Sequence, residues 1–130
     1  MNMTEEELEL LAFDPPHLGM PGRPSGCGRS EDGERFVEIF VSVENGLIVD
    51  AGFLTNIPGD GLICASLCCD AALGRTVEDA AALGEAECLA RLPEAVRNKI
   101  SQAGLDGLCL LALLRAVREA GAGSREGTAE

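Results

Sequence analysis

The sequence contains no tryptophan and no tyrosine, and phenylalanine occurs only four times in 130 residues. Proteins that bind single-stranded nucleic acid stack its bases on aromatic side chains, so this composition argues against that function. Basic residues are also scarce, since ten lysines and arginines stand against 22 acidic residues and the net charge is −12. This charge repels phosphate backbones and anionic membranes but attracts a basic protein. We therefore expect protein partners and neither nucleic acid nor a membrane.

Long apolar runs and a targeting pattern are absent as well. The longest apolar run, 108–114, is too short to cross a bilayer. The N-terminus carries glutamates where a signal peptide carries basic residues. We therefore expect a cytoplasmic protein, in which the six cysteines are reduced thiols.

Hydrophobic residues make up 46% of the sequence, which is enough for one hydrophobic core in a chain of this length. Apolar periodicity, capping residues and turn residues predict the helices and strands. Residues 13–34, rich in proline and glycine, are expected to form an ordered loop or a mobile arm. The predicted strands are 35–43 and 47–54, joined by an Asn-Gly turn, and the predicted helices are 4–12, 58–73, a short one from Thr76, 84–92, 93–102 and 104–120.

Strands followed by helices predict an α+β fold, in which helices pack on one face of a small antiparallel sheet. Residues 1–120 are expected to form a single domain. The polar, small residues at 121–130 are expected to form a flexible C-terminal tail.

Residues 13–19, the triplet Cys27-Gly28-Arg29 and residues 53–80, taken in this order, resemble the NifU/IscU family of iron–sulfur cluster assembly scaffolds. Residues 13–19 resemble the family's Tyr-x-x-Pro-x-x-x-Gly segment, and Cys27-Gly28-Arg29 stands where the family has Cys-Gly-Asp. Residues 53–80 match, without a gap, the family's Phe-Lys-Thr-x-Gly-Cys-Gly turn and the helix that ends in Lys-Gly-Lys-Ser/Thr-Leu-Asp-Glu-Ala. The resemblance covers residues 4–120 and implies a SufE/NifU-like fold.

The resemblance also implies a function. A scaffold of this family is not an enzyme in the strict sense, because it holds a labile iron–sulfur cluster. A cysteine desulfurase supplies its sulfur, and acceptor proteins remove the cluster. Residues 92–97 resemble the family's chaperone-binding Leu-Pro-Pro-Val-Lys segment in an altered form.

Two cysteines are the candidate cluster ligands. Thiolates hold iron–sulfur clusters, and a thiol ionises most easily near a cation or a helix N-terminus. Cys27 is predicted in a glycine-rich loop with Arg23 and Arg29 close in sequence, so we expect it to be reachable and activated. Cys109 stands early in the last helix, where the resemblance implies the third ligand.

The ligand set departs from the family at two further positions. Pro58 stands where the family has its second cysteine, and Leu108 replaces the histidine before the third. Asp60 is close enough in sequence to offer an oxygen ligand. Alternatively, a homodimer could pool two Cys27 and two Cys109 thiolates around one [2Fe–2S] cluster. The predicted ligands are therefore Cys27 and Cys109 for a cluster, and Cys27, Cys109 and Asp60 for a metal ion.

Two alternatives from other functional classes remain open. The protein can be a divergent relative without a cluster, acting as an interaction module or as a thiol or persulfide carrier that uses Cys27 alone. It can also be a zinc-binding protein that uses Cys27, Cys109 and an acidic residue, because the resemblance extends to relatives that hold zinc at this site.

The remaining cysteines and the only histidine have ordinary structural interpretations. Cys64 and Cys68 share a helix face at i and i+4, which suits either a metal half-site or a core position, and we favour the core. Cys69 and Cys88 are predicted in the core for the same reason. His17 has no partner that the sequence reveals, so a structural or exposed role is expected.

Overall fold

The computed structural model describes residues 2–129, and it describes side chains as far as residue 122. Helices pack on a three-stranded antiparallel sheet, which confirms the predicted α+β class. The elements in chain order are α1 (Glu5–Phe13), β1 (Gly26–Asp32), β2 (Arg35–Glu44), β3 (Leu47–Thr55), α2 (Asp60–Ala72), α3 (Val77–Ala81), α4 (Glu85–Cys88), α5 (Glu94–Gln102) and α6 (Leu105–Ala129).

The sheet has the order β1-β2-β3, and each strand is antiparallel to the next. The predicted turn joins β2 to β3 through Asn45 and Gly46, whose φ angles are 53° and 79°. These two residue types adopt positive φ at the lowest cost, so the sequence encodes this hairpin locally.

Strand β1 lies within residues 13–34, so the prediction of a loop or a mobile arm is wrong for this part of the chain. Gly26 and Gly28 face helix α6, and a Cβ atom on either would lie 2.1 Å from a backbone oxygen of that helix. The missing side chains therefore let the strand pack directly against the helix. Glycines that suggest a loop in the sequence permit a close approach inside a strand.

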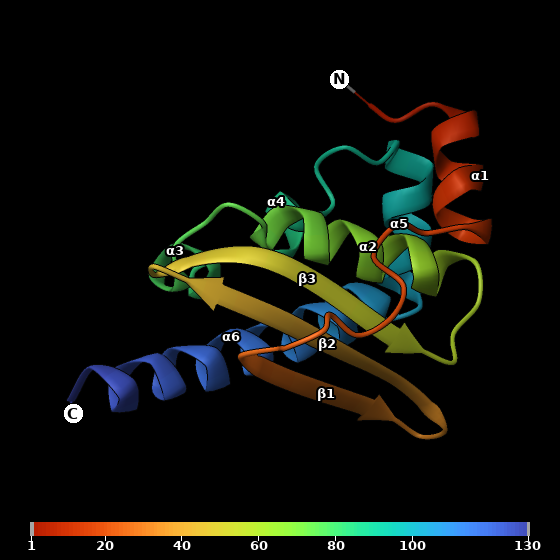
Figure 1. Ribbon diagram of the computed structural model, residues 1–130. Coiled ribbons are helices and arrows are strands. Elements are labelled where there is room, and N and C mark those ends of the chain that lie inside the picture. The colour runs from red at the N-terminus through yellow and green to blue at the C-terminus, as the bar shows by residue number, and fades with distance from the viewer. Residues whose placement is uncertain (1, 130) are drawn as a thin grey trace.

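Helices α2 and α6 cover one face of the sheet, which we call the inner face (Figure 1). Helix α6 packs on β1 and β2, and α2 packs on β3. Val37, Ile39 and Val41 of β2 point to this face and are fully buried, as the predicted alternation requires. Phe53 of β3 completes the buried surface beneath the helices.

The opposite face, which we call the outer face, carries Cys27, Phe40 and Gly52 in one row across the three strands. The segment that follows α1 crosses this face. The carbonyl oxygen of Gly19 lies only 2.1 Å from the position that a Cβ atom on Gly52 would take. The outer face is therefore covered in part by the N-terminal segment and not by a helix.

Local signals set several helix ends as predicted. Thr4 and Glu7 form a reciprocal capping box at the start of α1, with hydrogen bonds of 3.0 and 3.2 Å. The Thr76 side chain caps α3, and Gly74, with a φ of 81°, follows the end of α2. These ends depend on residues within one turn of the helix, which explains why the sequence reveals them.

Helix α6 continues past Ala120, its predicted end, to Ala129. The side chains of residues 123–130 lie outside the described part of the structure, so the division into a 1–120 domain and a flexible 121–130 tail stays a prediction. Across residues 2–122, no single helix is long and apolar enough to span a membrane, and α5 and residues 105–122 of α6 meet both conditions only as a pair bent by 78°.

Candidate functional site

Cys27, the first candidate ligand, lies in strand β1 opposite Phe40 of β2. Gly26 and Gly28 on either side of it face α6, and side chains alternate along a strand. The Cys27 side chain therefore projects from the outer face, away from the helices, and it is partly exposed. The prediction of a thiol in a flexible loop is corrected to a thiol on a paired strand.

The surroundings of Cys27 disfavour its thiolate, contrary to the prediction of an activated thiol. Its Sγ lies 3.5 Å from Oε2 of Glu38 on the neighbouring strand. Burial, and after it the negative charge of Glu38, raises the pKa of the Cys27 thiol from 9.0 to about 11. Arg29 acts in the opposite direction but more weakly, and its guanidinium pairs with Glu31 at 2.7 Å. Cys27 is therefore a thiol at neutral pH, which weakens it as a ligand and as a nucleophile.

Asp60, the candidate oxygen ligand, begins helix α2 and takes part in an ion pair. Its Oδ2 lies 3.4 Å from Nζ of Lys99 on α5. At the same end of the molecule, Arg35 pairs with Asp32 and donates from Nη1 to the carbonyl of Ala103 at 3.0 Å. A negative charge is favourable at a helix N-terminus, so a structural role accounts for Asp60.

Pro58 lies in the loop between β3 and α2, next to Gly59, which precedes the helix. This is the place where the resemblance implies a second cysteine ligand, and proline has no ligand atom. Among the side chains of residues 2–122, no group of three or more His, Cys, Asp and Glu is arranged to hold a metal ion. Cys27, Asp60 and Cys109 thus do not form a site in one chain, and a site shared by a homodimer stays a prediction.

Cys109 lies in α6 and is fully buried. Its thiol interacts with the thiols of Cys64 and Cys68 on α2, and Cys68 also interacts with Cys88 on α4. We call these four residues the core thiol cluster. Because Cys27 projects from the outer face and the cluster lies among the helices of the inner face, the sheet separates the two candidate ligands.

Hydrogen bonds within the core thiol cluster divide its members into two kinds. Those with Cys109 raise the pKa values of Cys64 and Cys68 and lower that of Cys109, and the one between Cys68 and Cys88 lowers the pKa of Cys88. A thiol that receives a hydrogen bond loses its proton more easily, whereas the donor retains its proton. At most one member of each interacting pair therefore ionises readily.

The predicted core positions of Cys64, Cys68, Cys69 and Cys88 are confirmed, because all four are buried. Their convergence with Cys109 is the feature that sequence reasoning missed. The i, i+4 spacing of Cys64 and Cys68 was the only signal of it. No local pattern shows that α4 and α6 each bring another thiol to the same place.

His17 holds the segment after α1 in position. Its Nε2 pairs with Oδ1 of Asp70 on α2 at 2.5 Å, and its carbonyl accepts a hydrogen bond from the Phe53 amide at 3.0 Å. These contacts join the segment to α2 and β3. These contacts favour a structural role for His17 over a merely exposed position.

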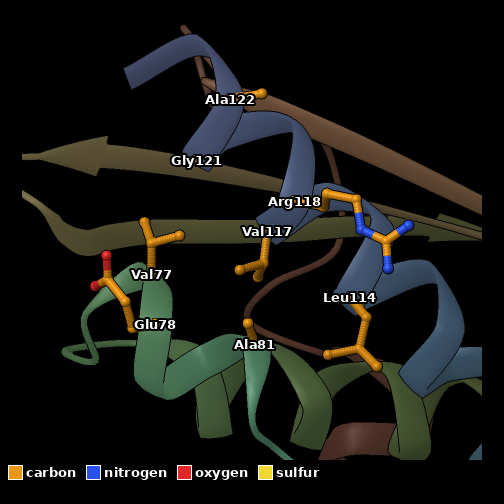
Figure 2. Close-up of a pocket in the computed structure, with 8 residues that line it drawn as sticks. All are labelled: Val77, Glu78, Ala81, Leu114, Val117, Arg118, Gly121 and Ala122. Atoms are coloured by element: carbon orange, nitrogen blue, oxygen red, sulfur yellow. The ribbon is translucent and has the colours of Figure 1, made fainter. Parts of the chain in front are cut away.

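A cavity of about 510 Å³ lies between α3 and α6, and sequence reasoning gave no sign of it (Figure 2). Val117 of α6 extends between Val77 and Ala81 of α3 (Figure 2). One acidic and one basic side chain also line it, and none of the lining residues is a thiol or a histidine. The lining residues are Val77, Glu78, Ala81, Leu114, Val117, Arg118, Gly121 and Ala122. The cavity suits an apolar group better than it suits catalysis.

Large apolar side chains are exposed at the end of α1 and in the segment after it. They are Leu10, Phe13, Leu18 and Met20, of which Phe13 is 87% exposed. We call these four residues the N-terminal apolar segment. They lie within eleven residues of the sequence, and exposed apolar side chains are candidates for contact with another protein.

Comparison with solved structures identifies the class of the fold. Over 92% of the chain, the structure is similar to the N-terminal part of a NifU-like protein from Brucella abortus, with a TM-score of 0.66, 15% identity and 94% of that chain covered. It is also similar to an iron–sulfur cluster assembly scaffold protein for the SUF system from Fervidobacterium islandicum, with a TM-score of 0.65, 14% identity, and 88% and 96% of the two chains covered.

No known protein-family profile matches the sequence, and no curated protein matches it significantly. At 14–15% identity, the structural similarity establishes a NifU-like scaffold fold for this chain. The fold that the resemblance implied is therefore confirmed.

Proposed function

We propose that this protein acts in iron–sulfur cluster assembly as an interaction module with the scaffold fold, without holding a cluster on Cys27 and Cys109. The strongest support is the contrast between the wide extent of the scaffold fold and the separation of the two candidate ligands. The fold of the assembly scaffolds extends over nearly the whole chain, whereas Cys27 and Cys109 lie on different sides of the sheet. A [2Fe–2S] cluster needs four terminal ligands at one point, but binding of a partner needs only the shape and surface of the fold. In this proposal the protein is not an enzyme and works in the cytoplasm.

A cysteine desulfurase is the proposed partner, because the fold is that of scaffolds which receive sulfur from such an enzyme. The N-terminal apolar segment is the proposed contact surface. Exposed acidic residues, Glu6, Glu9 and Asp14, stand close to it in sequence, and the whole chain carries a charge of −12. This combination suits a partner surface that has apolar pockets within a basic rim.

Phe13 offers the sharpest test of the contact surface. Replacement of Phe13 by Ala should weaken binding to a cysteine desulfurase by about tenfold or more in calorimetric titration, because buried aromatic anchors dominate such interfaces. The exposure of Phe13 means that the variant should fold normally. Leu111→Ala is the matched control, since Leu111 is also exposed but lies on α6. Equal affinity of Phe13→Ala and the unaltered protein would reject this surface.

Anaerobic reconstitution with iron and sulfide tests the cluster. Absorption and Mössbauer spectra should show no cluster, and metal analysis should show no stoichiometric zinc. A cluster that forms and is lost in Cys27→Ser would instead support the scaffold function. Cys27 lies at the surface, so this substitution separates loss of a ligand from loss of folding. The role of Cys27 as a persulfide carrier is disfavoured by its raised pKa.

A further inference from the structure

Cys88, at the end of α4, lines a surface cavity that none of the preceding functions uses. The cavity has a volume of about 480 Å³ and lies between α2 and α4. Leu67 and Asp70 of α2 contribute to one wall, and Glu87 and Arg91 lie on the side of Cys88. The thiol of Cys88 therefore borders a space large enough to admit small molecules, although only 5% of the residue is exposed.

A second thiol stands behind the first. Cys68 of α2 is 1% exposed, and interaction with its side chain is the largest influence on the pKa of Cys88, which it lowers. The two residues belong to different helices, 20 positions apart in the sequence. The cavity thus leads to a pair of cysteines, one reachable from solvent and one protected behind it.

The groups around Cys88 come from three elements. The hydrogen bond from Cys68 lowers the pKa of Cys88, and Arg75, in the turn before α3, acts in the same direction. Burial raises the pKa of Cys88, and so do the charges of Cys64 on α2 and Glu87 on α4. The lowering effects are larger, so the pKa of Cys88 lies below 9.0. Nη2 of Arg75 lies 4.0 Å from Oε2 of Glu87. A cysteine in such a position is more reactive than a buried cysteine without a partner.

We propose that Cys88 is a peroxide-reactive thiol and that Cys68 is the resolving thiol, so that oxidation by a hydroperoxide links α2 to α4 by a disulfide. Hydrogen peroxide is small and neutral, and a cavity of about 480 Å³ is large enough to hold it. This modification is independent of the proposed role in cluster assembly.

Each step of this reaction balances. The Cys88 thiolate attacks one peroxide oxygen, so that a sulfur–oxygen bond forms, the oxygen–oxygen bond breaks and hydroxide leaves. The hydroxide takes up the proton that the Cys88 thiol released on ionisation and becomes water. The sulfur of Cys68 then attacks the sulfur of the Cys88 sulfenic acid. A disulfide forms, the sulfur–oxygen bond breaks, and the departing oxygen takes the Cys68 proton and leaves as water. The two thiols have lost two electrons, and the peroxide has been reduced to two molecules of water.

Peptide mapping after treatment of the full chain with hydrogen peroxide tests the proposal. Cleavage at arginine and lysine places Cys64, Cys68 and Cys69 in residues 36–75, Cys88 in 76–91, and Cys109 in 100–115. We expect the 36–75 and 76–91 peptides to be linked after oxidation and released by a reductant. At pH 8, Cys88 should be oxidised at least about ten times faster than Cys27, since Cys27 carries very little thiolate at that pH.

Two variants identify the roles within the pair. Cys68→Ala should leave a sulfenic acid on Cys88 that a 1,3-dione reagent traps, whereas Cys88→Ser should abolish the linked peptide. Cys27→Ser is the control and should leave the linkage unchanged. The proposal is overturned if Cys27 reacts before Cys88, or if 36–75 is linked to 100–115 instead. The map of the unaltered protein decides this even if a core variant fails to fold.

Discussion

Cys27 and the core thiol cluster present the same side chain in two surroundings, on the two sides of one sheet. Cys27 is alone on the outer face, and burial, together with the neighbouring carboxylate of Glu38, raises its pKa to about 11, so that it keeps its proton. Cys88 of the cluster borders a cavity, and a hydrogen bond from Cys68 lowers its pKa. The more exposed thiol is therefore the weaker acid.

This difference shows that position in a glycine-rich segment is a poor guide to thiol chemistry. Sequence reasoning favoured Cys27 because it stands between two glycines and near two arginines. The two glycines allow β1 to pack closely against α6. Arg29 stacks over the Phe36 ring, with its guanidinium carbon 4.1 Å from the ring centroid. The neighbours in space, and not those in sequence, determine which cysteine ionises.

The largest expected effect concerns the two faces of β1. Gly28→Val should lower the free energy of unfolding by about 3 kcal/mol, because the new side chain would overlap the α6 backbone at Ala112. Cys27→Val, one residue away on the outer face, should change it by about 0.5 kcal/mol or less. Urea unfolding followed by circular dichroism measures both. Similar losses in the two variants would contradict the assignment of the faces.

A single substitution made on both sides of the sheet gives the next largest difference. Cys109→Ser buries a hydroxyl among thiols and should cost about 1–3 kcal/mol, whereas Cys27→Ser should cost about 0.5 kcal/mol or less. Thermal unfolding by calorimetry compares the two. If Cys109→Ser proves neutral, Cys109 is less tightly packed than its complete burial indicates.

The pH dependence of Cys27 sharpens the comparison further. Its folded pKa of about 11 lies above the ordinary value of 9.0, so the stability that its protonated form contributes is complete below pH 9 and is lost as the pH rises towards 11. Glu38→Gln should lower this pKa and increase several-fold the rate of iodoacetamide alkylation of Cys27 at pH 9, measured by mass spectrometry. Glu44→Gln, at the end of β2, is the control and should leave the rate unchanged.

The smallest expected effect concerns Asp60, the third candidate ligand. Lys99→Ala removes the partner of Asp60 and should cost less than about 1 kcal/mol, because Lys99 is largely exposed. Arg97→Ala removes the same charge from α5, and Arg97 forms no ion pair with the side chains of residues 2–122. Urea unfolding at low and high salt should show that the difference between the two variants disappears as salt screens the pair. A difference that persists at high salt would assign Asp60 another role.

Much of the fold could be predicted from the sequence because its signals are local. The Asn45-Gly46 turn and the Thr4 cap each depend on residues a few positions apart. Strand β1 was not predicted because its inward residues are Gly26, Gly28 and Ser30, which carry no hydrophobic signal along the sequence. The candidate site was predicted less well, since Cys27 and Cys109 match the resemblance in order along the chain and not in space.

The sequence by itself determined the α+β class, the hairpin, the buried face of β2 and the acidic charge of this protein. Periodicity, capping and turn chemistry are short-range effects, and each is readable within one element. Only the tertiary structure decided that the sheet separates Cys27 from Cys109 and that α2, α4 and α6 bring four thiols together. The physical reason is that a pKa depends on burial and on the charges and hydrogen bonds around a group, and packing places those neighbours from distant parts of the chain.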